Sequence, residues 1–222
     1  MLLKKIGFLL ISLFSAGSFA YTFNETSPVE EGEEVVATGL KIGDAWALAD
    51  RKMPSTSGDL VSLKSLSKDK GLLVIFSCNT CPFVVGNGDS EGWEGRYNGL
   101  ADKAADLNIG SVLVNSNEAK RPGDDSMEEM IQHAKDADYS MTYALDKASE
   151  LANAFGAKTT PHVYLFNNEG SLVYMGAIDD NNGSAADVEK HYLIDAMNEL
   201  AKGEAISTPS TRPLGCSIKR VK

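Results

Sequence analysis

The feature that most constrains the fold is an apolar run that leads directly into two closely spaced cysteines. Residues 72–76 are all apolar, and Ser77 separates them from Cys78-Asn79-Thr80-Cys81-Pro82. An apolar run of this length without polar alternation indicates a strand that is buried on both faces. If a helix starts at the pair, its unpaired N–H groups favour the thiolate form of Cys78. We therefore expect a redox-active thiol pair at the end of a central strand.

The first twenty residues have the three parts of a secretory signal peptide. Lys4 and Lys5 give a positive start, residues 6–14 are apolar, and Ser18-Phe19-Ala20 provides small residues at a cleavage site. We therefore expect a periplasmic or secreted protein. No later run is long and apolar enough to cross a bilayer, so we expect no membrane span after the signal is removed.

The chain is acidic, with 222 residues and a formal net charge of −10 at pH 7. The expected signal peptide holds two lysines and no acid, so its removal makes the charge more negative. This balance argues against nucleic acid or an anionic membrane as a partner. No glycine-rich phosphate-binding motif follows a strand, so we expect no bound organic cofactor.

The chain divides into four expected segments. Residues 1–20 form the signal peptide, residues 21–38 a flexible acidic leader, residues 39–203 one folded domain, and residues 204–222 an irregular tail. The leader is expected to be flexible because it is rich in glutamate and poor in apolar residues.

Hydrophobic patterns predict strands that alternate with helices in the folded domain. The predicted strands are residues 72–76, 111–115, 142–145, 163–166 and 172–175, and the predicted helices are residues 97–107, 127–134, 148–155 and 188–200. Residues 167–170 are typical of a hairpin turn, and Gly156 and Gly203 are typical of helix ends. This order predicts an α/β fold with a mixed sheet flanked by helices. Short apolar patches within residues 45–66 predict an additional hairpin or short strands before the main sheet.

An ordered set of motifs makes the chain resemble the thioredoxin superfamily. Cys78-x-x-Cys81 follows a buried strand, Thr160-Pro161 precedes another strand, and the domain ends in a hairpin and a helix. Within the superfamily the chain is most similar to redoxin-type proteins related to the alkyl hydroperoxide reductase and thiol-specific antioxidant group, which carry a Cys-Asn-x-Cys-Pro-aromatic motif. Roughly residues 43–219 take part in this resemblance. It implies a thioredoxin-like mixed β-sheet flanked by helices, with an N-terminal strand extension.

The resemblance also implies the roles of individual residues. Cys78 would be the attacking thiol and Cys81 the resolving thiol. Independently of the resemblance, the expected position at the start of a helix should lower the pKa of Cys78 more than that of Cys81. Pro161 would be a cis-proline, and Thr160 and Pro161 would bind an extended substrate. The implied activity is that of an exported thiol-disulfide oxidoreductase. Its partners would be protein or small-molecule disulfides and thiols, together with a redox partner protein that the sequence does not identify.

Two other activities stay open. In a thiol peroxidase, Cys81 would be the reactive residue. Peroxiredoxins have Thr or Ser three residues before their reactive cysteine, and in this chain that position is held by Cys78. In a Cu(I)-binding chaperone, Cys78 and Cys81 would bind the metal, with or without His162 as a third ligand. A zinc site is not expected, because four ligands are needed and no second cysteine pair exists. We also expect no carboxylate beside the pair, since residues 71–77 contain none.

The third cysteine has three possible roles. The chain contains only Cys78, Cys81 and Cys216, so one thiol is left over if the first two form a disulfide. Cys216 would then be an accessory redox thiol that folds back on the pair, a cysteine that links two chains, or a small buried residue. The sequence does not decide among these.

Overall fold

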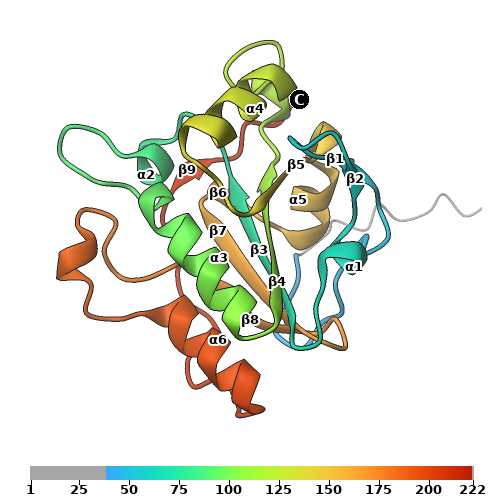
Figure 1. The fold of residues 1–222 in the computed structure, drawn as a ribbon, viewed down its shortest axis with the longest axis vertical. Coiled ribbons are helices and arrows are strands. Elements are labelled where there is room, and N and C mark those ends of the chain that lie inside the picture. Colours follow the sequence, from blue (N-terminus) through green and yellow to red (C-terminus); the bar gives the residue numbers. More distant parts are fainter. Residues whose placement is uncertain (1–38, 222) are drawn as a thin grey trace, which may run out of the picture. The chain divides into compact units, whose positions relative to one another are not determined.

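The computed structural model describes residues 39–221 (Figure 1). The predicted signal peptide, residues 1–20, and the predicted leader, residues 21–38, lie outside the described residues. Between residues 39 and 221, none of the helices has both the length and the apolar character needed to cross a membrane.

A mixed five-stranded sheet forms the centre of the fold, with the order β5-β4-β3-β7-β8. Its strands are β3 (Gly71–Ser77), β4 (Ile109–Asn115), β5 (Thr142–Leu145), β7 (His162–Asn167) and β8 (Leu172–Gly176). The first three run parallel to one another, whereas β7 is antiparallel to both β3 and β8. The predicted mixed sheet is confirmed, and so is the late hairpin.

Helices cover both faces of this sheet (Figure 1). They are α1 (Leu63–Leu66), α2 (Pro82–Val85), α3 (Tyr97–Asp106), α4 (Met127–Asp136), α5 (Glu150–Phe155) and α6 (Tyr192–Lys202), with short 3-10 turns at Glu94–Arg96, Glu118–Lys120, Lys147–Ser149 and Ala185–Asp187. The first face packs against α2, α3, α4 and α6, and the second packs against α1 and α5. The fold is therefore the α/β sandwich of three layers that the alternation predicts.

The central strand β3 explains why the apolar run was a strong signal. Every residue of β3 is buried, because the strand contributes to the cores on both faces. Leu73 and Ile75 lie in the first core, and Leu72, Val74 and Phe76 lie in the second. This alternation follows from the two-residue period of a strand.

Residues at the helix ends behave largely as predicted. Gly156 and Gly203 end α5 and α6 in the left-handed conformation, with φ of 71° and 73°. The Ser126 side chain accepts a hydrogen bond of 3.2 Å from the Glu129 amide at the start of α4. These local signals fix where the helices end and therefore where the loops around the cysteines begin.

Two small antiparallel sheets accompany the main one. The pair β1 (Met53–Pro54) and β2 (Leu60–Val61) confirms the predicted N-terminal strand extension. The pair β6 (Thr159–Thr160) and β9 (Cys216–Ser217) was not predicted. It brings part of the expected irregular tail back to the domain, where the Ile218 amide also donates to the carbonyl oxygen of Lys158.

Candidate active site

The two cysteines of the pair lie at the carboxyl end of β3. Cys78 follows the strand directly, and Cys81 is the N-cap residue of α2, which begins at Pro82. Both side chains are almost fully buried, with exposed fractions of 2% and 4%, and both thiols are free. The chain therefore holds the two sulfur atoms in a protected site where a strand turns into a helix.

Thr160 contacts both cysteines from the opposite side. The Thr160-Pro161 bond is cis, as the resemblance implied. Cys78 Sγ lies 3.2 Å from Thr160 Oγ1, and Cys81 Sγ donates a hydrogen bond of 3.1 Å to the Thr160 carbonyl oxygen. The structure thus brings the predicted residues Cys78, Cys81, Thr160 and Pro161 together.

Hydrogen bonding and burial separate the pKa values of the two thiols. The pKa of Cys78 is held well above its ordinary value, first because its thiol donates a hydrogen bond to Cys81 and second because it is buried. Accepting that hydrogen bond lowers the pKa of Cys81 to about 5, although burial opposes the change. Cys216 and the Thr160 hydroxyl lower the pKa of Cys81 further. Near neutral pH the pair therefore carries one negative charge, and Cys81 bears it.

This order of pKa values is the reverse of the predicted one. The prediction placed Cys78 at the start of a helix, where unpaired N–H groups would favour its thiolate. In the structure the helix starts four residues later, at Pro82, so Cys78 lies outside it. The charge of the buried Asp125 carboxylate raises the pKa of Cys78 further.

Polar contacts hold the two residues between the cysteines. The Asn79 amide donates to Asp125 Oδ1 at 3.0 Å, and the Asn79 side chain donates to the Asp124 carbonyl oxygen at 2.8 Å. The Tyr143 hydroxyl donates to Asn79 Oδ1 at 2.8 Å. Two segments outside the pair, the loop before α4 and strand β5, thus fix the turn between the cysteines.

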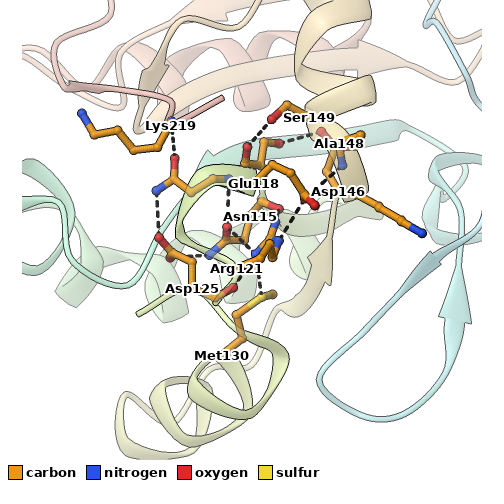
Figure 2. A network of polar contacts seen from close by, with 12 residues as sticks. Asn115, Glu118, Arg121, Asp125, Met130, Asp146, Ala148, Ser149 and Lys219 are labelled. Atoms are coloured by element: carbon orange, nitrogen blue, oxygen red, sulfur yellow. Dashed lines mark hydrogen bonds and ion pairs between the residues drawn. The ribbon is translucent and has the colours of Figure 1, made fainter. Parts of the chain in front are cut away.

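The carboxylate of Asp125 belongs to a larger buried network (Figure 2). Its oxygens accept hydrogen bonds from the side chains of Asn115, at 2.7 Å, and Asn117, at 3.0 Å. Arg121 donates to the carbonyl oxygens of Asn115 and Asp125, both at 2.5 Å. Asn117 Oδ1 in turn accepts from the Lys219 amide at 2.8 Å, which connects the network to the C-terminal tail.

The expectation that no carboxylate lies beside the pair is therefore wrong. Asp125 is fully buried and reaches the pair from the loop before α4. Asp125 is distant in sequence from residues 71–77, the strand that precedes the cysteines. A usable signal was present, because Asn115 ends the neighbouring parallel strand β4, Asn117 follows it, and both side chains need a buried acceptor.

His162 points away from the thiols. It pairs with Phe76 in the β3–β7 ladder, its ring packs 4.7 Å from that of Tyr164, and both neighbours belong to the second core. Cys78 and Cys81 belong to the first core, on the other face of the sheet. The proposed three-residue copper site is not formed, and no group of three His, Cys, Asp or Glu side chains within residues 39–221 is arranged to hold a metal ion.

Cys216 lies beside the pair. It faces Thr160 across the β6–β9 ladder, and opposed residues of an antiparallel pair project to the same face. Its backbone amide and its thiol both lower the pKa of Cys81, and its side chain packs against the core that contains both other cysteines. All three cysteines of the chain therefore meet around Thr160.

A cavity of about 190 Å³ opens next to the turn between the cysteines. Asn79 and Thr80 form one wall, and the loop before α4 and that helix form the other. The lining includes Asp124, Glu129, Asp136 and His133. Its acidic character would favour cationic groups on a molecule that approaches the pair.

Comparison with known proteins agrees with this geometry. A family model described as Redoxin matches residues 41–192. No protein with a curated description matches the chain.

Several solved structures share the fold. An uncharacterized conserved protein from Geobacillus kaustophilus is 27% identical, with a TM-score of 0.73 over 82% of this chain and 93% of that one. A hypothetical protein from Sinorhizobium meliloti is 29% identical, with a TM-score of 0.72 over 82% and 96%. A putative thiol:disulfide interchange protein from Chlorobium tepidum is 15% identical, with a TM-score of 0.52 over 74% and 98%, which is a likeness of fold alone.

Proposed function

This chain belongs to the redoxin family of the thioredoxin superfamily, and from that premise we propose that it is an exported thiol-disulfide oxidoreductase that uses Cys78 and Cys81. The observation that carries the proposal is the charged, buried pair: the pKa of Cys81 is lowered to about 5 while the Cys78 thiol stays protonated beside it. A thiolate next to a second thiol within ring-closing distance is what disulfide exchange requires.

In the proposed reaction, Cys81 attacks first. Its thiolate bonds to one sulfur of the substrate disulfide, and the other sulfur leaves with the electron pair and takes up a proton. The Cys78 thiol then loses its proton and attacks Cys81 Sγ. The mixed disulfide breaks, the substrate leaves as its second thiol, and Cys78 and Cys81 end as a disulfide. The roles of the two cysteines are thus exchanged relative to the sequence-based prediction, and the reverse reaction oxidises a dithiol.

Thr160 would position the reacting atoms. Its hydroxyl contacts Cys78 Sγ and its carbonyl contacts Cys81 Sγ, so one residue holds both sulfur atoms. The hydroxyl can donate to a thiolate on Cys78, which is the leaving sulfur when the pair is reduced.

The test traps the mixed disulfide in variants of the mature chain. The Cys78→Ser/Cys216→Ser variant retains only Cys81 and should form a stable mixed disulfide with glutathione disulfide, seen as a mass increase. The Cys81→Ser/Cys216→Ser variant retains only Cys78, whose pKa burial and the Asp125 charge still raise after Cys81 is removed, so it should react more slowly near pH 7. Faster reaction at Cys78 would restore the original roles. Failure of both variants to react would reject the function.

Thiol peroxidase activity is a second candidate, because the thiolate resides on Cys81 and accepts a hydrogen bond from Cys78. In that reaction the thiolate attacks one peroxide oxygen, the other oxygen leaves as water or an alcohol, and Cys81 becomes a sulfenic acid. Dimedone should then label Cys81 in the Cys78→Ser/Cys216→Ser variant at micromolar peroxide. Labelling only at millimolar peroxide would reject this candidate.

Export is part of the proposal and has its own test. Lys4, Lys5 and the apolar residues 6–14 support it. Expression of the full chain in a bacterium, followed by fractionation, should give a periplasmic or secreted protein whose first residue is Tyr21. Recovery in the cytosolic fraction with residues 1–20 still attached would contradict it.

A further inference from the structure

The tail strand β9 occupies the exposed edge that Thr160 would offer to a substrate. Thr159 and Thr160 pair with Ser217 and Cys216 in antiparallel register. An extended peptide that binds a strand edge makes the same kind of ladder. The chain therefore places its own cysteine at the position that such a peptide would take.

Gly215 permits this close approach. A Cβ atom on residue 215 would lie 2.2 Å from the Thr160 carbonyl oxygen, which is far too close for any side chain. A larger residue would push β9 away from Thr160 and would carry Cys216 with it. The local sequence thus allows the tail to lie tightly against the thiol pair.

We propose that Cys216 is a third exchanging thiol, which forms an alternative disulfide with Cys81. The inference rests on the proposed exchange reaction, since it needs Cys78 and Cys81 to become oxidised. Three observations carry it: Cys216 faces Thr160 across the ladder, Thr160 contacts the sulfur atoms of both other cysteines, and the Cys216 side chain packs against the core of the pair.

The exchange is internal and needs no additional oxidant. Cys216 loses its proton and attacks Cys81 Sγ in the Cys78–Cys81 disulfide. The Cys78–Cys81 bond breaks and its electron pair leaves with Cys78, which takes up a proton. A Cys81–Cys216 bond forms, so one disulfide replaces another and the oxidation state of the chain does not change.

Electrostatics makes this step depend on the state of the pair. In the reduced chain, burial raises the pKa of Cys216 to about 11, and donation to Cys81 and the negative charge of Cys81 contribute. When Cys81 is part of a disulfide, that charge is gone. The pKa of Cys216 then falls, because both contributions of Cys81 disappear while burial still raises it and the Lys219 charge still lowers it. Cys216 is thus a better nucleophile beside the oxidised pair than beside the thiolate.

The alternative disulfide can be read directly from tryptic peptides. Cys78 and Cys81 lie together in the peptide of residues 71–96, and Cys216 lies in that of residues 203–219, because trypsin does not cut Arg212-Pro213. The mature wild-type chain is oxidised with glutathione disulfide, quenched in acid, alkylated and digested without reduction. We expect two populations, one with a disulfide inside 71–96 and one in which 71–96 is joined to 203–219.

Two variants test whether the joining disulfide is Cys81–Cys216 and whether it depends on the face of β9 that carries the thiol. The Cys78→Ser chain should join the two peptides in most molecules while it runs as a monomer on a non-reducing gel. In Cys78→Ser/Cys216→Ser/Ser217→Cys the thiol moves by one residue to the other face of β9, so the joined peptides should be lost at least tenfold. A disulfide between two chains, or equal joining by both variants, would overturn the proposal.

Failure of this inference can be told from failure of the proposed function. If the only oxidised wild-type species has its disulfide inside 71–96, and Cys216 is alkylated in every molecule, Cys216 takes no part although the exchange reaction stands. If the Cys78→Ser variant forms the disulfide between peptides 71–96 and 203–219 but the chain does not react with any protein disulfide, the proposed function fails. The proposed pairing of Cys216 with Cys81 then still stands. The wild-type map needs no substitution, so a poorly folded variant cannot hide the answer.

Discussion

Asp125 accepts a hydrogen bond of 3.0 Å from the backbone amide of Asn79, a residue 46 positions earlier in the sequence. This contact ties the turn between the two cysteines to the loop before α4. The Asp125 carboxylate also accepts from two asparagine side chains, so its oxygens are well satisfied. It acts on the pair through position and through its charge.

Asp125→Asn should destabilise the fold and lower the pKa of the Cys78 thiol. The amide leaves at least one donor of Asn79, Asn115 or Asn117 without its acceptor, which costs about 1–3 kcal/mol in urea unfolding. The pKa of Cys78 should fall, because the charge of Asp125 raises it. Asp124→Asn is the matched control, since the Asp124 side chain is about half exposed and contacts only Lys120. Equal effects of the two substitutions would contradict this role for Asp125.

Thr160→Val should raise the pKa of Cys81. The Thr160 hydroxyl is one of the groups that lower it, and valine keeps the shape without the hydroxyl. Loss of one hydrogen bond of about 1 kcal/mol corresponds to somewhat less than one pKa unit. Ultraviolet absorbance of the thiolate, followed against pH, measures the change. Thr159→Val, whose hydroxyl bonds to the Pro161 carbonyl oxygen, should leave the curve in place.

The reaction with a small disulfide should lose rate as the pH falls through about 5, where Cys81 becomes protonated. Cys78→Ala removes the largest cause of this low pKa, so the acid limb should move toward neutral pH. The stability of the reduced fold should also decrease as the pH falls. The pKa of Cys81 is lower in the folded chain than in the unfolded one, so its ionisation stabilises the reduced fold at high pH and this contribution disappears as the pH falls to about 5. An acid limb that is identical in both chains would show that another group titrates.

The Cys78–Cys81 couple should be oxidising relative to a couple with ordinary thiols. A lowered pKa stabilises the reduced form, and a stable reduced form makes the disulfide readily reducible. Equilibration with glutathione buffers of known ratio, followed by mass spectrometry of alkylated protein, gives the potential. A pair that stays oxidised at every ratio would contradict the prediction and the proposed function together.

Arg121→Lys should cost about 1–3 kcal/mol in the free energy of unfolding. Arg121 donates to two backbone carbonyls and to Asn115 Oδ1 at 3.0 Å, and a lysine ammonium cannot reproduce this planar geometry. The neighbouring substitution Lys120→Arg is the control, because Lys120 is half exposed and should change the free energy by less than about 0.5 kcal/mol. Figure 2 shows Arg121 at the centre of its polar contacts.

Local signals were sufficient to predict most of the fold. The apolar run before Cys78, the hairpin turn at residues 167–170 and the helix ends at Gly156 and Gly203 each depend on neighbouring residues, and all are confirmed. Long-range contacts were not predictable in the same way. The strand β9 has two residues and therefore no periodic pattern, yet it decides where Cys216 lies.

The errors at the site have physical reasons too. The predicted pKa of Cys78 depended on its own strand and on a helix expected to start at the pair. The groups that change the thiol pKa values in the structure include Asp125 from a distant loop and Cys216 from the tail. The face on which His162 lies was predictable, because His162, Tyr164 and Phe166 are two residues apart along β7 and therefore share one face of the strand. Two-residue periodicity would have placed it on the face away from the thiols.

The pairing of β9 with Thr160 has a consequence for substrate choice. Because the tail is part of the same chain, it competes for this edge at an effective concentration on the order of millimolar. If the proposed exchange reaction takes a peptide substrate at this edge, that peptide would have to displace the tail, whereas a compact disulfide that needs no ladder with Thr160 would not. The tail would then act as a tethered competitor, and substrates would be discriminated by how strongly they bind the edge, before any sulfur reacts.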